Sequence, residues 1–237
     1  MPNSYFKFKQ FTINQEHCAM KVCTDACILG AWFSTKIQQY NTVLDIGAGT
    51  GLLMMMLAQR SQNEIHGIEI DGAAYQQLQE NTRQNDWQQR LTVFQGDARS
   101  YSFPRQYDFI ISNPPFFESD LLSANDREQI AKHSTLLTLE ELIQVIAGNL
   151  QPHGSFGILL PYHRWEYFHQ LAHQHHFSLT EKLVVKQTPR HTPFRAILQY
   201  TRNKADRPTT HDLTIQQIDR VYTPEFVELM KEYYLYL

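Results

Sequence analysis

Short apolar runs alternate with helical stretches along this 237-residue chain, and no other feature constrains its fold as strongly. The apolar runs are 43–46, 65–69, 91–95, 107–112 and 155–160, with two later ones at 179–186 and 196–201. Helical stretches lie at 26–33, 52–60, 72–84, 139–150 and 163–175, and a last one starts at Pro224. Strands and helices that alternate in this way form a parallel sheet with right-handed crossovers. The sequence predicts an α/β fold with a seven-stranded, mostly parallel sheet.

The last two runs depart from this alternation. Only a loop containing Pro and Arg separates 179–186 from 196–201, so we expect a late antiparallel hairpin there. Residues 203–210 have the composition of a linker. We therefore expect a single domain over 1–237, with an N-terminal extension (1–40), a core (41–202) and a C-terminal tail with a helix (203–237).

Composition argues against several classes of protein. No apolar run approaches the roughly 18 residues of a membrane span, and the N-terminus lacks the apolar region of a secretory signal. A cytoplasmic protein without a membrane partner is expected. Cys18, Cys23 and Cys27 are an odd number in one short window, which favours free thiols. We expect no metal site, because the histidines within 173–176 have no acidic or Cys partner nearby.

Charge is segregated along the chain, whose net charge is −3. Residues 151–207 carry eight Lys/Arg and three Asp/Glu, whereas residues 1–150 carry 11 and 16. A polyanionic partner would therefore find a basic third in an acidic whole.

A glycine-rich turn directly follows the first core strand. Residues 45–51 read Asp-Ile-Gly-Ala-Gly-Thr-Gly, with Gly47, Gly49 and Gly51 at alternate positions. Such a turn lets a ligand approach the backbone closely. The third glycine of the dinucleotide fingerprint is missing, because Leu52 stands in its place. A tight turn without a ligand is the alternative.

Acidic residues follow the next two strands. Glu69 ends the second strand, where a carboxylate can accept both hydroxyls of a ribose. Asp71 is better explained as a helix N-cap. Asp97 and Ala98 follow the third strand, and the Asp97 carboxylate could accept a hydrogen bond from an adenine amino group. The ends of successive parallel strands meet in one crevice, so these groups are expected to share a ligand site.

The fourth strand ends in Asn113-Pro114-Pro115-Phe116. Two prolines fix an extended backbone and remove N–H donors. The Asn113 side-chain oxygen and the Pro114 carbonyl can then accept the two hydrogens of an exocyclic amine, while Phe116 offers a face for stacking. We expect these four residues to be catalytic.

These motifs resemble those of class I, S-adenosylmethionine-dependent methyltransferases that act on amino groups. Asp45 to Gly51 resemble the cofactor glycine motif, Glu69 the ribose-binding acid, Asp97 the adenine contact, and Asn113 to Phe116 the (Asp/Asn)-Pro-Pro-(Tyr/Phe) motif. The resemblance implies a Rossmann-like class I methyltransferase fold, S-adenosylmethionine as cofactor, S-adenosylhomocysteine as product, and no metal.

The N-terminal extension narrows the resemblance. Residues 6–11 (FKFKQF), 19–25 (AMKVCTD) and 29–32 (LGAW) are similar to the bacterial tRNA adenine-N6 methyltransferases, and the likeness covers essentially the whole chain. It implies adenine 37 in the anticodon loop of valine tRNA as the target. The sequence shows no sign of an obligate protein partner, and none is expected. The resemblance also implies that the extension lies over the cofactor site, with Thr24 and Asp25 at the methionine end of the cofactor. A helix N-cap is the alternative role for these two residues.

A basic rim around the crevice is expected to hold the RNA. With the resemblance supplying the first five, its members are Lys7, Lys9, Lys21, Lys132, His133, Lys186, Arg190 and Arg195. Scattered, solvated charges are the alternative.

Four other functions remain open. A guanine-N2 methyltransferase of ribosomal RNA carries a similar motif, and a protein-glutamine methyltransferase carries Asn-Pro-Pro, usually followed by Tyr. An NAD oxidoreductase would share the glycine turn, and a non-catalytic RNA-binding module would share the basic segment.

Overall fold

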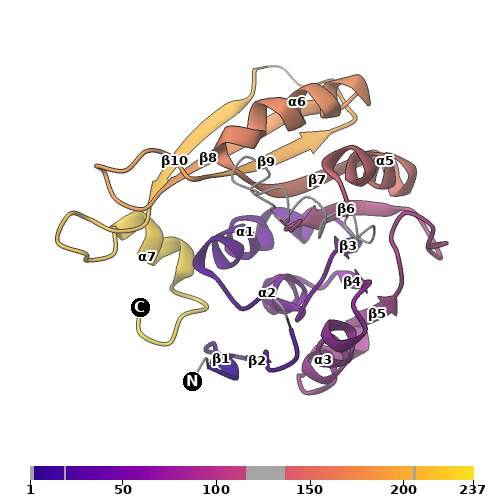
Figure 1. Cartoon of the computed structure of the whole chain (residues 1–237), viewed down its shortest axis with the longest axis horizontal. Helices are drawn as coiled ribbons and strands as arrows, with labels where there is room; N and C mark the ends of the chain where they lie inside the picture. The colour runs from indigo at the N-terminus through magenta and orange to yellow at the C-terminus, as the bar shows by residue number, and fades with distance from the viewer. Residues whose placement is uncertain (1–2, 19, 116–136, 205–206) are drawn as a thin grey trace, which may run out of the picture.

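The computed structural model describes residues 3–18, 20–115, 137–204 and 207–237. Within them, two strands form an N-terminal hairpin and eight form the main sheet in the order β10-β8-β9-β7-β6-β3-β4-β5 (Figure 1). The hairpin strands are β1 (Tyr5–Lys7) and β2 (Thr12–Asn14). The main strands are β3 (Thr42–Ile46), β4 (Glu64–Glu69), β5 (Leu91–Gln95), β6 (Tyr107–Ser112), β7 (Leu150–Pro161), β8 (Ser178–Lys186), β9 (Arg195–Thr201) and β10 (Thr209–Thr214).

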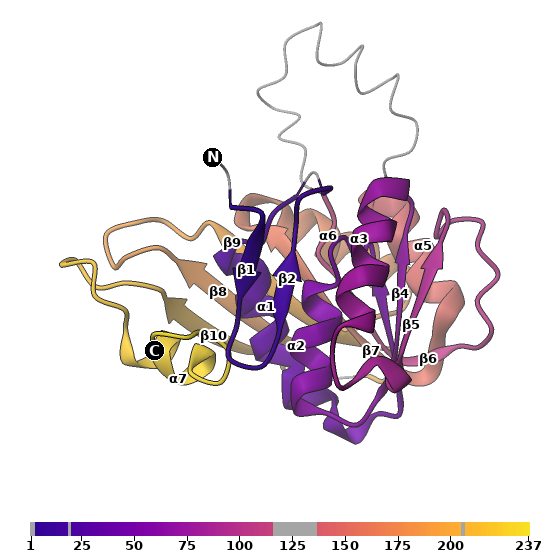
Figure 2. The same ribbon diagram turned by 90° about the horizontal axis from the view of Figure 1, so that it is seen from below.

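Helices cover both faces of this sheet, as Figures 1 and 2 show. The described helices are α1 (Thr24–Ser34), α2 (Leu52–Arg60), α3 (Gly72–Arg83), α5 (Leu139–Asn149), α6 (Trp165–Gln174) and α7 (Pro224–Met230), with short 3-10 turns at Lys36–Gln39, Gln88–Arg90 and Tyr162–Arg164. Helices α1, α2, α3 and α7 pack against one hydrophobic cluster, whereas α5 and α6 pack against the other.

The alternation of side chains along the central strands produces these two clusters. In β6, Phe109 and Ile111 belong to one cluster and Ile110 to the other. Successive side chains of a strand point to opposite faces, so a strand buried on both faces reads as a continuous apolar run. The run at 107–112, which forms β6, has this character.

The late hairpin is confirmed. β8 pairs with β9 in antiparallel fashion, and β9 pairs with β7 in the same way. β9, which lies between β7 and β8, is therefore the antiparallel strand of an otherwise parallel sheet. The expected helix cap at Asp71 also forms, because its side chain accepts from the backbone N–H of Ala74. At the start of α5, Thr138 and Glu141 make a reciprocal capping box.

The expected strand number was wrong. Part of the segment expected to be a linker and tail is β10, which pairs in parallel with β8 as an eighth strand at the sheet edge. Its sequence, Thr-Thr-His-Asp-Leu-Thr, buries only Leu213 and has no apolar run. An edge strand with one buried side chain leaves almost no hydrophobic pattern in the sequence.

The termini pack onto the same cluster as the core. Phe8 and Ile13 from the first 40 residues are buried with Phe226 and Tyr233 from the last 35. Among the described helices none is long and apolar enough to cross a membrane. The cysteines are free, as expected, and burial raises the pKa of the Cys23 thiol to about 12.

Candidate active site

The glycine turn lies between β3 and α2 with three glycines in the left-handed region. The φ angles of Gly47, Gly49 and Gly51 are 76°, 54° and 85°. A Cβ built on Gly47 or Gly49 meets no atom within 4 Å, whereas one on Gly51 would lie 2.7 Å from Leu78 Cδ1. Gly51 is therefore required by packing against α3. Gly47 and Gly49 instead leave open space above the turn, where a side chain would otherwise stand.

Glu69, at the end of β4, reaches across to this turn. Its carboxylate accepts hydrogen bonds from the backbone N–H groups of Gly49 and Asp71, each at 2.9 Å. The residue is buried. A carboxylate has about four acceptor positions, so two remain for a ligand. Parallel pairing of β3 with β4 places Glu69 beside the glycine turn, as the strand-end argument predicted.

Asp45 is a fully buried carboxylate below the same turn. Neither of its oxygens has a hydrogen-bond partner among the described residues. Burial, and then the negative charge of Glu69, raise the pKa of Asp45 to about 8. A buried polar group without a partner is costly. The site therefore has an acceptor in place that a donor on a bound ligand would satisfy.

Asp97 follows β5 and is held by its own neighbour. Arg99 Nε lies 2.9 Å from both carboxylate oxygens, and Arg99 Nη2 lies 2.6 Å from Oδ2. These hydrogen bonds lower the pKa of Asp97. Ala98, beside it, packs on the cluster that contains α5.

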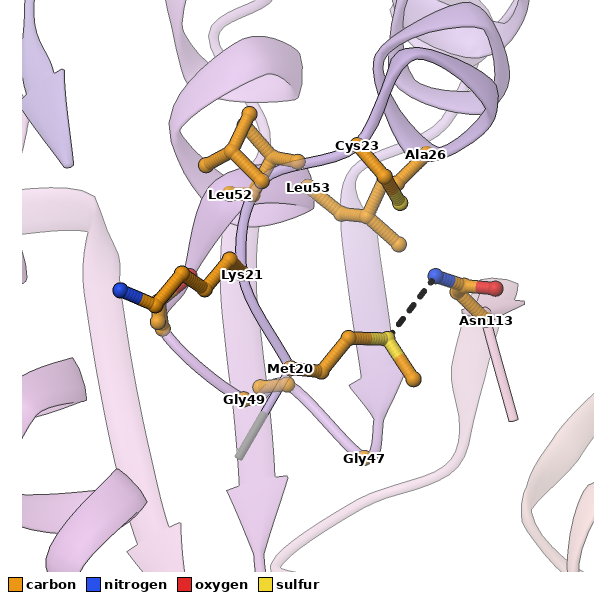
Figure 3. Close-up of a pocket in the computed structure, with 12 residues that line it drawn as sticks. Met20, Lys21, Cys23, Ala26, Gly47, Gly49, Leu52, Leu53 and Asn113 are labelled. Carbon is orange, nitrogen blue, oxygen red and sulfur yellow. Dashed lines mark hydrogen bonds between the residues drawn. The ribbon is translucent and has the colours of Figure 1, made fainter. Parts of the chain in front are cut away.

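Asn113 directly follows β6, which lies two strands away from β4 and Glu69 in the sheet. Its Oδ1 atom is buried and has no hydrogen-bond partner in the described structure. Its Nδ2 atom lies 3.9 Å from the sulfur of Met20 (Figure 3). Pro114 and Pro115 follow it in non-helical backbone, whereas Phe116 lies outside the described residues.

A pocket of about 60 Å³ lies between the glycine turn and Asn113 (Figure 3). Its walls are the glycine turn, the start of α2, Asn113 and the segment Met20–Cys23, which we call the strap. Ligand pockets usually span about 300–1,000 Å³. The pocket between the strap and the glycine turn is smaller than this range.

Comparison with known proteins shows which family the chain belongs to. Residues 26–178 match the family model described as methyltransferase small domain. The chain belongs to this family. It is 42% identical to the tRNA1(Val) (adenine(37)-N6)-methyltransferase of Dyadobacter fermentans, over 98% of each chain. It is 38% identical to the protein of the same name in Bacteroides thetaiotaomicron, over the full length of both.

Solved structures share the fold of this methyltransferase family member. A predicted O-methyltransferase from Agrobacterium tumefaciens aligns with a TM-score of 0.69 at 16% identity, covering 87% of this chain and 95% of the other. A putative RNA methyltransferase from Pyrococcus horikoshii aligns with a TM-score of 0.54 at 21% identity, covering 77% and 84%. Both confirm the expected class I methyltransferase fold.

The first turn of α1 does not have the helix cap that was considered for Thr24 and Asp25. The N-cap residue is Cys23, without a side-chain capping bond, and Thr24 is exposed inside the helix. The helix-cap role was therefore wrong. Asp25 instead pairs with Arg195, whose Nε lies 2.6 Å from Oδ2. This ion pair joins α1 to β9.

The structure places the residues of the expected basic rim in different environments. Lys7 and Arg190 are exposed and Lys186 is half-buried near the late hairpin. Lys9 and Lys21 donate to backbone carbonyls, Lys9 to Lys231 and Leu237 and Lys21 to Asn3 at 3.1 Å. Arg195 begins β9 rather than lying on the loop. Lys132 and His133 fall outside the described residues.

Sequence reasoning missed the strap as a pocket wall and Arg99 as the partner of Asp97. Met20 carries no motif chemistry, so only the fold could place its thioether beside Asn113. Arg99 stands two residues after Asp97 on a turn, where a basic side chain can fold back on the carboxylate. The spacing between Asp97 and Arg99 could therefore have predicted this pair from the sequence.

Proposed function

We propose that this protein transfers a methyl group from S-adenosylmethionine to the N6 amine of an adenine in tRNA, and that the target is adenine 37 in the anticodon loop of valine tRNA. The observation that carries the proposal is the buried Asn113 Oδ1, which has no hydrogen-bond partner among the described residues and belongs to a residue lining the same pocket as the open glycine turn. The names of the full-length relatives support the choice of adenine and of tRNA.

The residues of the turn fit the proposed cofactor. Gly47 and Gly49 leave room for a ligand against the backbone, and Glu69 retains acceptor positions for ribose hydroxyls. Asp45 supplies an acceptor without a hydrogen-bond partner among the described residues. We assign Asp97, which follows β5, to the adenine. When bound, S-adenosylmethionine supplies an electrophilic methyl group. We infer that no metal takes part, since this chemistry requires no Lewis acid.

The chain's own task is to prepare the amine. The N6 lone pair of adenine is delocalised into the ring. If Asn113 Oδ1 and the Pro114 carbonyl each accept one amino hydrogen, the lone pair localises on nitrogen and points away from both acceptors. No strong base is needed, because the proton leaves after the new bond forms. Positioning of this kind contributes roughly 7–11 kcal/mol in well-oriented systems.

The substrate must reach this pocket as an unstacked base. Flipping is least costly in a single-stranded loop, which favours an anticodon loop over a duplex. Among the described members of the basic rim, the side chains of Lys7, Lys186 and Arg190 make no hydrogen bond or ion pair within the described chain, and we assign them to the RNA backbone. A tRNA substrate would place the activity in the cytoplasm.

Mass spectrometry of nucleosides tests the proposal. Unmodified valine tRNA is incubated with the protein and a methyl donor carrying a trideuterated methyl group. We expect labelled N6-methyladenosine, which disappears when adenine 37 is replaced by guanine. Label on guanine N2, on a protein glutamine, or on no product at all would overturn the proposal.

A further inference from the structure

Arg99 connects two parts of the molecule that the sequence separates. Through Nε and Nη2 it holds both oxygens of Asp97, at 2.6–2.9 Å. Through Nη1 it reaches Glu141 Oε1 on α5, at 3.1 Å. The other Glu141 oxygen accepts from the backbone N–H of Thr138, at 2.9 Å, as part of the α5 capping box. One side chain thus ties the turn after β5 to the start of α5.

The geometry limits what Asp97 can still bind. Its backbone turn adds a further donor, because the N–H of Arg99 lies 3.0 Å from Oδ1. Three N–H groups therefore occupy the carboxylate. Since an ionised carboxylate has about four acceptor positions, about one remains. The bidentate fork also fixes the plane of the carboxylate, which a lysine could not do.

We infer that Arg99 is a positioning residue that makes Asp97 selective for the 6-amino group of the cofactor's adenine. This inference rests on the proposed function. A fixed carboxylate with one open acceptor position accepts one N–H and repels a carbonyl oxygen placed there. Without Arg99, the Asp97 side chain can rotate and solvate its charge, and this discrimination weakens. Glu141 contributes by holding the far side of the guanidinium.

Two pairs of variants isolate this role. Arg99→Gln removes the fork, and Arg99→Lys keeps the charge without the fork. Glu141→Gln removes the ion pair and retains the capping box, because Gln serves equally at that position. Arg105→Gln is the matched control: Arg105 pairs with Glu64 at 2.8 Å, away from Asp97.

The readout is the ratio of two dissociation constants measured by calorimetry, one for S-adenosylhomocysteine and one for its 6-oxo analogue, S-inosylhomocysteine. We expect the parent protein to prefer the amino compound by about tenfold or more, the usual effect of one charge-assisted hydrogen bond. Arg99→Gln should reduce the ratio to near one, Arg99→Lys should give little rescue, Glu141→Gln should be intermediate, and Arg105→Gln should match the parent.

The outcomes separate this inference from the proposed function. A parent protein that binds neither compound contradicts the proposed function and, with it, the role of Arg99. A parent that binds both equally, or an Arg99→Gln protein that keeps the full preference, overturns the positioning role alone. A merely structural role of Arg99 would weaken both compounds together and leave their ratio unchanged.

Discussion

At the scale of a single residue, Asp45 makes the stability of the folded protein depend on pH. Its pKa is 3.8 in an unfolded chain and about 8 in the folded protein. Between these values the folded state keeps a proton that the unfolded state has lost. Stability therefore falls as pH rises through this window and levels off above about pH 8.

An Asp45→Asn variant tests whether Asp45 causes this pH dependence of stability, because the asparagine amide cannot titrate. We expect the urea midpoint of the ligand-free parent to fall between pH 5 and pH 8, and that of the variant to fall clearly less. Denaturation curves at four pH values measure both. Parallel pH profiles for the two proteins would show that Asp45 is not the group responsible.

The glycine turn acts at the scale of an element. Gly49 has a φ of 54° and open space where its Cβ would be. Gly49→Val would place a branched side chain in that space and strain the backbone by about 1–3 kcal/mol. We expect a folded, less stable protein whose affinity for S-adenosylhomocysteine falls by at least about tenfold.

Gly148→Val is the control for this prediction. A Cβ at Gly148 also meets no atom within 4 Å, but the residue lies near the end of α5. Calorimetry compares the two variants at equal folded fraction. Unchanged affinity in Gly49→Val would move the cofactor away from the turn.

The whole molecule must hold a polyanion despite its net charge of −3. We expect the logarithm of its affinity for tRNA to fall with the logarithm of salt concentration, by about 0.7–0.9 per phosphate contacted. Replacing Lys186 and Arg190 together by Ala should flatten this slope. Arg83→Ala, at the end of α3, is the control. Filter binding at several salt concentrations measures the slope, and an unchanged slope in the double variant would remove these residues from the interface.

Most of the architecture was readable from the sequence because central strands are buried on both faces. The apolar run at 107–112 is an example, and it forms the strand β6 as expected. β10 was not readable, because an edge strand that buries only Leu213 leaves no pattern.

The residues of the candidate site likewise divide into those whose positions the sequence predicts and those whose positions it does not. The proximity of Gly47, Gly49, Glu69 and Asn113 could be predicted because their positions at strand ends follow from the α/β pattern itself. The Asp25–Arg195 pair joins residues 170 positions apart, and the Met20 contact to Asn113 joins residues 93 apart. Pairings of this range depend on how the strap and β9 pack, which no local pattern records.

The central claim is that the Asn113 acceptor acts on the reacting amine, and single-turnover kinetics on valine tRNA tests it most directly. Asn113→Ala should lower the methyl-transfer rate by about 10²–10³-fold, with unchanged affinity for S-adenosylhomocysteine. Asn113→Asp, which retains the acceptor oxygen, should lose much less. A rate for Asn113→Ala within a few-fold of the parent, at saturating tRNA and methyl donor, would contradict the account.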